Sequence, residues 1–124
     1  MICIDTSSMI AYLEGAEGKD ITVIDHALLD QVAVFSPITL TELLSAPNLT
    51  TTLRQTFLGI PLLPLQDGFW ERAGLLRAKI LTKGHKARLA DTLIAQTCLD
   101  HHIPLVTRDE DFQVFHRLAK LELL

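Results

Sequence analysis

The sequence predicts an α/β fold built on a mainly parallel central sheet. Short apolar runs alternate with amphipathic helical segments along the chain, the runs lack the polar alternation of a solvent-facing sheet, and glycine or proline residues separate the segments. Strands that alternate with helices pair in parallel through right-handed crossovers. A chain of 124 residues is long enough for one independent core, so we expect residues 1–124 to form a single domain.

Five apolar runs are expected to be strands. Pro61 and Pro64 lack the amide hydrogen that a central strand needs, so the third run is expected at or near a sheet edge, and Pro104 is tolerated at a strand start. The first run is apolar at every position, which is typical of a parallel strand buried on both faces. The runs are Met1–Ile4, Val32–Phe35, Ile60–Leu65, Ile103–Thr107 and Leu121–Leu124.

Helices are expected between these runs, from apolar residues at three- and four-residue steps. Thr6–Ser8 offer hydroxyls to cap the first helix, which ends before Gly15, and Asp20 can cap the second. Thr39 to Glu42 are expected to open the third helix, which Pro47 stops. Later helices are expected over Leu49–Leu58, Phe69–Thr82, the segment from Leu89 to His102, and Phe112–Leu118.

The segment Gly84–Phe112 organises the predicted site. Its helix from Asp91 to His102 spans about 16 Å, and its strand from Pro104 to Asp109 returns by about 16 Å. A short connection makes the two elements antiparallel, so Asp91 and Asp109 reach the same edge. That edge is the carboxyl end of a strand, where open α/β sheets place their sites.

Four carboxylates are expected in equivalent places at this edge. Asp5 follows the first strand, Glu42 opens the helix after the second strand, Asp91 opens a later helix, and Asp109 follows a late strand. Each has a structural alternative: Asp5 and Asp109 suit helix caps or Asx turns, Glu42 completes a capping box with Thr39, and Asp91 complements a helix dipole.

Together, however, the four carboxylates favour a metal site. Like charges a few ångströms apart destabilise a fold, and a divalent cation reverses that effect. Carboxylate oxygens completed by waters suit Mg²⁺ or Mn²⁺, which stabilise the charge of a phosphoryl displacement. The hydroxyls of Ser7 and Thr107 are placed to hold these carboxylates or their waters.

Three segments of the chain resemble, in order, the PIN domain family, and specifically the small VapC-type toxins of toxin–antitoxin systems. The segments are ICIDTSSMIAYL, SPITLTELL and GHKARLADTLIAQTCLDHHIPLVTRDEDF. Thr92 stands where family members commonly have alanine. The resemblance implies a three-layer PIN-like domain, its central sheet flanked by helices, and an Mg²⁺- or Mn²⁺-dependent endoribonuclease. It implies catalytic acids at Asp5, Glu42, Asp91 and Asp109, and metal ligands at Asp5, Asp91, Asp109 and Asp111, with the nearer of Asp109 and Asp111 left open.

The distribution of charge supports an RNA substrate despite a net charge of −4. Six of the eleven Lys and Arg residues lie between positions 72 and 88, where they can steer a phosphate backbone. We expect RNA contacts from Lys83, Lys86 and Arg88. His85 is either a further phosphate contact or solvated, and His101-His102 fit a helix C-terminus better than a zinc site, because no HExxH spacing accompanies them.

Compartment and partners follow from the apolar residues. Cys3 and Cys98 lie in apolar surroundings without a spacing motif, which indicates buried thiols in a reducing compartment, and no signal peptide or membrane span is seen, so a cytoplasmic protein is expected. The resemblance to VapC-type toxins implies a homodimer and a small inhibitory antitoxin, and a mean hydropathy of +0.29 indicates more apolar surface than one core can hide. The expected donors are Met9, Ile10, Leu13, Ile24, Leu28 and the helix Leu49–Leu58, while Trp70 is expected in the core or an interface.

Three other functions compete with a ribonuclease. A receiver-like signalling module needs adjacent acids after its first strand and a lysine beyond its last strands. Here Asp5 is followed by Thr6, and Asp109 is followed by Glu110. A DxD-type phosphatase needs a second acid where Ser7 stands. A catalytically silent PIN-like RNA-binding domain remains open, although all four acidic positions are filled.

Overall fold

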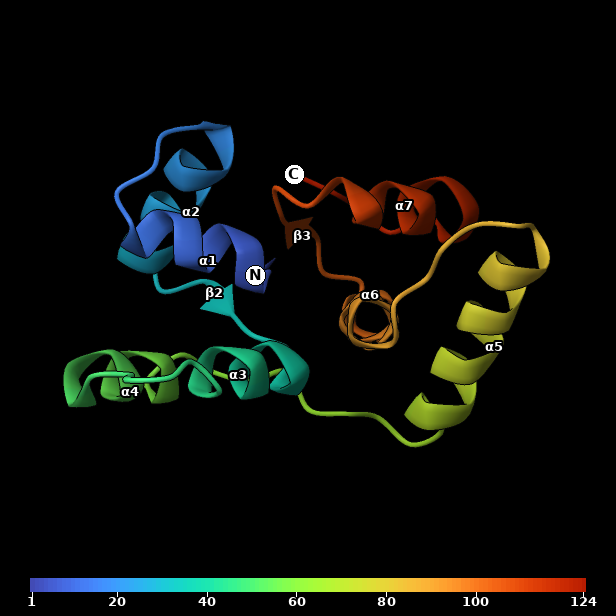
Figure 1. Ribbon diagram of the computed structural model, residues 1–124, viewed down its shortest axis with the longest axis horizontal. Coiled ribbons are helices and arrows are strands. Elements are labelled where there is room, and N and C mark those ends of the chain that lie inside the picture. Colours follow the sequence, from blue (N-terminus) through green and yellow to red (C-terminus); the bar gives the residue numbers. More distant parts are fainter.

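A parallel three-stranded sheet lies at the centre of the protein. The computed structural model describes all residues, 1–124. Strand β1 (Ile2–Ile4) lies between β2 (Ala33–Val34) and β3 (Leu105–Val106) and pairs with both in parallel, so the predicted α/β class is confirmed. The helices surround this sheet, with α6 near the middle and α5 at the outer edge (Figure 1).

Seven α-helices and one short 3-10 helix connect and flank the strands. They are α1 (Thr6–Leu13), α2 (Lys19–Leu29), α3 (Pro37–Leu44), α4 (Thr51–Leu58), α5 (Phe69–Thr82), α6 (Leu89–His101), η1 (Glu110–Phe112) and α7 (Gln113–Ala119). Each expected helix is present, with boundaries shifted by a few residues. No helix of the protein combines the length and the apolar character that crossing a membrane requires.

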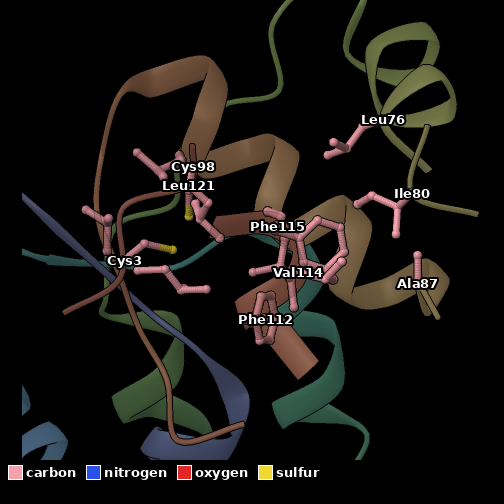
Figure 2. Close-up of a cluster of buried hydrophobic side chains, with 14 residues drawn as sticks. Cys3, Leu76, Ile80, Ala87, Cys98, Phe112, Val114, Phe115 and Leu121 are labelled. Carbon is pink, nitrogen blue, oxygen red and sulfur yellow. The ribbon is translucent and has the colours of Figure 1, made fainter. Parts of the chain in front are cut away.

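The two faces of the sheet are buried in two separate hydrophobic clusters, as unbroken apolar strands predict. Successive side chains of a strand point to opposite faces, so Cys3 and Leu105 join one cluster while Ile4 and Val106 join the other. Helices α5, α6 and α7 cover the first face, where Phe115 lies between the side chains of α5 and Cys98 of α6 (Figure 2). Helices α1 to α4 cover the second face, which gives three layers.

Two expected strands shrink to isolated bridges. In the run 60–65, the Phe35 amide donates to the Pro61 carbonyl at 3.0 Å, and the Leu63 amide donates to Phe35 at 2.9 Å. Pro61 and Pro64 have no amide hydrogen, so the pairing cannot extend. The run 121–124 likewise pairs with β3 only at the Leu105–Leu123 bridge.

Three further expectations can be compared with the structure. Cys3 and Cys98 are free and buried, as expected, and both lie in the first cluster (Figure 2). Asp20 does not cap α2: Gly18 occupies the N-cap position and Asp20 lies in the first turn. Trp70 is 62% exposed, so it does not lie in the core, and a place in an interface stays a prediction.

Candidate metal-dependent active site

Asp5 stands at the carboxyl end of β1 and is held by two hydroxyls. Its Oδ2 accepts hydrogen bonds from Ser7 Oγ at 2.7 Å and from Thr107 Oγ1 at 2.8 Å. It occupies the N-cap position of α1, as its structural alternative proposed, but makes no side-chain capping bond there. Burial raises the pKa of Asp5, and the two hydroxyls oppose that rise. The carboxylate is therefore oriented by its neighbours.

Successive hydrogen bonds hold the loop that follows β3 and begins at Thr107. The Asp109 amide donates to Thr107 Oγ1 at 3.0 Å, and the Asp111 amide donates to Asp109 Oδ1 at 2.9 Å. Asp109 thus does cap η1, as its structural alternative proposed. Phe112 is fully buried at the end of η1 and anchors the loop in the core. One continuous network runs from Asp5 to Asp111.

Asp91 meets the two carboxylates of this loop. One oxygen from each of Asp91, Asp109 and Asp111 lies within 4.8 Å of the others. Burial, and then the charges of Asp109 and Asp5, raise the pKa of Asp91 to about 6. Asp91 lies in the first turn of α6, where a helix N-terminus favours a carboxylate, yet burial and the neighbouring carboxylates shift its pKa in the opposite direction.

The buried Oδ2 of Asp91 supports a cation at this cluster. This oxygen has no hydrogen-bond partner, although buried polar atoms are almost always paired. A buried carboxylate oxygen without a donor is satisfied by a positive charge, and the other carboxylates of the group supply none. Asp5 lies outside the 4.8 Å group but close enough for its charge to act on Asp91.

Glu42 lies in the last turn of α3 (Pro37–Leu44) rather than at its start. The helix begins two residues earlier than expected, because Ser36 is the N-cap and a proline follows it, so the capping box of Thr39 and Glu42 was wrong. Glu42 Oε1 accepts a hydrogen bond at 2.7 Å from Oγ1 of Thr6, the residue that directly follows Asp5 in the chain. Glu42 therefore borders the site without joining the group of three. Sequence reasoning missed Thr6, which it assigned to helix capping.

Two of the three expected RNA-binding cations lie against the acidic cluster. Lys86 Nζ is 3.7 Å and Arg88 Nε is 3.9 Å from Asp111 Oδ2. These side chains are more than half exposed, and surface pairs of this kind are weak. Lys83 is exposed and has no ion pair. All three side chains remain accessible to a phosphate.

Three other cations of the basic segment have partners within the protein, while the expectation that the segment from Arg72 to Arg88 binds RNA phosphates stays a prediction. Arg72 binds Asp100, with 2.6 Å between Nη2 and Oδ2. Arg77 donates to the Ala87 carbonyl at 2.9 Å, and Lys79 donates to the Leu118 carbonyl at 2.7 Å. The cations nearest the carboxylates are therefore the strongest candidates for contacts to phosphate.

The histidines do not form a metal site. No histidine belongs to the candidate ligand group. His101 Nε2 lies 2.7 Å from the Pro64 carbonyl and so ties the end of α6 to the loop before α5. His102 ends α6 in a left-handed conformation, with φ of 53°.

An apolar groove opens beside Glu42, between α1, α3 and α4. Its volume is about 280 Å³, and Glu14 and Glu42 are its two acidic residues. The apolar lining is Ile10, Leu13, Leu43, Ala46, Leu49, Leu53 and Phe57. Of the expected donors of apolar surface, Met9 and Ile24 are instead buried in the core.

Comparisons with known proteins agree on one family. The model of the family described as "PIN domain" matches residues 2–121. The VapC ribonuclease Mb1587 of Mycobacterium bovis is 34% identical over 131 residues, which cover 98% of this chain and 96% of the relative.

Solved structures share the fold. FitAB bound to the IR36 DNA fragment has a TM-score of 0.75 at 21% identity, covering 100% of this chain and 94% of that one. VapBC2 from Rickettsia felis, bound to a DNA fragment from its promoter, has a TM-score of 0.74 at 21% identity and covers 100% of this chain and 98% of that one.

Proposed function

Because the chain belongs to the PIN domain family and, within it, to the VapC group, we propose that it is a divalent-cation-dependent endoribonuclease and the toxin of a toxin–antitoxin pair. The observation that carries the metal dependence is the convergence of one carboxylate oxygen from each of Asp91, Asp109 and Asp111, and the buried Asp91 Oδ2 without a donor supports it. The similar proteins are named ribonucleases, and this supports RNA as the proposed substrate.

The acidic residues divide into ligands and supporting groups. Asp5, Asp91, Asp109 and Asp111 would hold Mg²⁺ or Mn²⁺, since all are hard oxygen donors. Such a cation, when bound, supplies Lewis acidity that stabilises charge on phosphoryl oxygens. Ser7 and Thr107 fix the Asp5 carboxylate, and Thr6 fixes Glu42. Asp5, Glu42, Asp91 and Asp109 are the proposed catalytic acids.

The RNA backbone is proposed to approach over the segment before α6. Lys83, Lys86 and Arg88 stand between the end of α5 and Asp91, and two of them already lie within 4 Å of a site carboxylate. A phosphate bound there would be delivered to the acidic cluster. The cations also reduce the repulsion between the phosphate and the carboxylates.

The apolar groove is the proposed seat of the antitoxin. Similar structures are VapBC toxin–antitoxin complexes, and an amphipathic helix laid into a hydrophobic groove is a common mode of recognition. Glu42 lines both the groove and the site border, so an occupant with an Arg or Lys there would cover a catalytic acid. A homodimer and a cytoplasmic location remain predictions.

Cleavage of RNA by the purified chain tests this proposal. Addition of Mg²⁺ or Mn²⁺ should permit cleavage, while EDTA or the substitution Asp5→Asn should abolish it. Expression of the chain alone should arrest growth, and co-expression with the adjacent small reading frame should restore growth and yield a complex. Metal-independent or absent cleavage by the folded protein would favour a silent PIN-like RNA-binding domain.

A further inference from the structure

Arg108 stands between Thr107 and Asp109, yet its guanidinium contacts another part of the molecule. It forms a two-pronged ion pair with Asp20 of α2: Nε donates to Oδ2 at 2.8 Å, and Nη2 donates to Oδ1 at 2.9 Å. Nη2 also lies 3.3 Å from the Glu17 carbonyl. The pair joins residues 88 positions apart. It has no part in the acidic site as described above.

Asp20 is itself held in place by α1. The Ser8 hydroxyl is fully buried and donates to Asp20 Oδ2 at 2.9 Å. The Asp20 side chain is only 12% exposed, so the ion pair is shielded from water on its acidic side. Planar pairs with two parallel hydrogen bonds are the most directional ion pairs in proteins. Arg108 is therefore docked on a rigid acceptor.

Gly18 leaves the space that this pair occupies. Its φ is +147°, a backbone conformation that residues with a side chain rarely adopt. A Cβ at this position would lie 2.7 Å from Asp20 Oδ1 and 3.4 Å from Arg108 Nη2. A glycine at the N-cap of α2 is thus required both by the backbone and by the ion pair. We call Ser8, Gly18, Asp20 and Arg108 the clasp.

Resting on the metal site proposed above, we propose that the clasp positions the loop from Thr107 to Asp111 and so sets the affinity for the divalent cation. The loop is held from two sides by consecutive residues: Thr107 donates to Asp5, and Arg108 binds Asp20. Asp109 and Asp111 repel Asp91, so this loop needs attachments that resist their separation. Residues that orient metal ligands in this way commonly change metal affinity by 10- to 100-fold.

Binding of Mn²⁺ to the purified protein, measured by calorimetry or by the EPR signal of free Mn²⁺, tests the clasp without any cleavage assay. Arg108→Ala and Asp20→Asn should each raise the dissociation constant by about tenfold or more. Arg108→Lys keeps the charge but loses the second hydrogen bond, so an intermediate constant is expected.

The chain contains a matched control pair. Arg72 and Asp100 form the other two-pronged Arg–Asp pair, between α5 and α6, and neither residue lies on the loop. Arg72→Ala and Asp100→Asn should lower the melting temperature but leave the Mn²⁺ constant within about twofold of wild type.

The possible outcomes separate this inference from the proposed function. Absence of Mn²⁺ binding by the wild-type chain contradicts the metal site itself. If the wild type binds and the folded clasp variants bind equally well, the positioning role is wrong. It is also wrong if the clasp and control variants weaken binding to the same extent, because the effect is then general destabilisation.

Discussion

The two ends of α6 carry the same residue type in opposite electrostatic states. Asp100, in the last turn, accepts hydrogen bonds from Arg72 and from Gln96, and Arg72 lowers its pKa. Asp91, in the first turn, has a buried oxygen without a donor and a pKa raised to about 6. The helix dipole favours a carboxylate at Asp91 and disfavours one at Asp100. The specific neighbours of each residue therefore shift its pKa in the direction opposite to the one that the dipole favours.

This difference distinguishes the end of α6 that is paired within the protein from the end where we propose a metal site. The middle of α6 is fixed in the core by Ile94, Ala95 and Cys98, all fully buried. Asp100 is neutralised by the protein itself, so that end needs no ligand. Asp91 is left with uncompensated negative charge, which is what a cation-binding site requires. The following predictions test this contrast.

Exchange of each aspartate for asparagine should have opposite effects. Asp91→Asn should reduce RNA cleavage by at least about 100-fold, because it removes a charge from the metal site, and should raise the melting temperature in EDTA by relieving repulsion. Asp100→Asn should lower the melting temperature, because it removes the charge that pairs with Arg72 and one of the two acceptor oxygens, and should preserve cleavage. Both are measured on the same preparations. Full cleavage by Asp91→Asn would place the site elsewhere.

The stabilisation of the protein by metal should depend on Asp91 and not on Asp100. A ligand that binds only the folded protein adds about 2.7 kcal/mol at 100 times its dissociation constant, so Mg²⁺ or Mn²⁺ should raise the melting temperature of the wild type. Asp100→Asn should keep this increase, and Asp91→Asn should lose most of it. A flat response of the wild type to millimolar Mg²⁺ and Mn²⁺ would count against the metal site, and a preference for Zn²⁺ would point to histidines.

Local patterns made much of this fold predictable. The alternation of apolar runs and amphipathic segments gave the order of elements, and unbroken apolar strands such as Met1–Ile4 gave a sheet buried on both faces. Asp5 and Thr107 were expected at one edge because parallel strands end together, and the structure brings them to 2.8 Å. The start of α3 was misplaced although Ser36-Pro37, a hydroxyl cap before a first-turn proline, signalled it.

Side-chain partners far apart in the chain were not predictable. Arg108 pairs with Asp20 across 88 positions, and Arg72 pairs with Asp100 across 28. Nothing local in the sequence distinguishes these cations from Lys86, which lies at the acidic cluster. A charge pattern can indicate that a basic segment exists, but the folded contacts decide which of its members are free for RNA.

The cations that precede α6 should contribute to RNA binding. Arg72 of α5, which pairs with Asp100 at the other end of α6, should not. Replacement of Lys83, Lys86 and Arg88 by alanine should weaken RNA binding in EDTA and reduce the salt dependence by up to about one unit of slope for each lost phosphate contact. Arg72→Ala is the control, since its guanidinium is engaged by Asp100. An unchanged slope in the triple variant would mean that RNA approaches from another side.

The pH dependence of stability in EDTA should show the two ends of α6 responding in opposite directions. Asp91 has a folded pKa of about 6 against an ordinary value of 3.8, so the folded protein binds the extra proton between these values and its stability falls as pH rises through them. Asp91→Asn should match the wild type near pH 4 and exceed it above pH 6. The expected gain is about 1–2 kcal/mol after allowance for solvent screening of a half-exposed group. Asp100 has a lowered pKa, so its contribution to the free energy of unfolding is present above pH 3.8 and is lost as pH falls below that value. Asp100→Asn should therefore be less stable than the wild type at pH 7 and approach it in acid. Denaturant unfolding of the three proteins from pH 3 to pH 8 measures both differences. Parallel curves would show that the repulsion at Asp91 is relieved by movement of its neighbours rather than held by the fold.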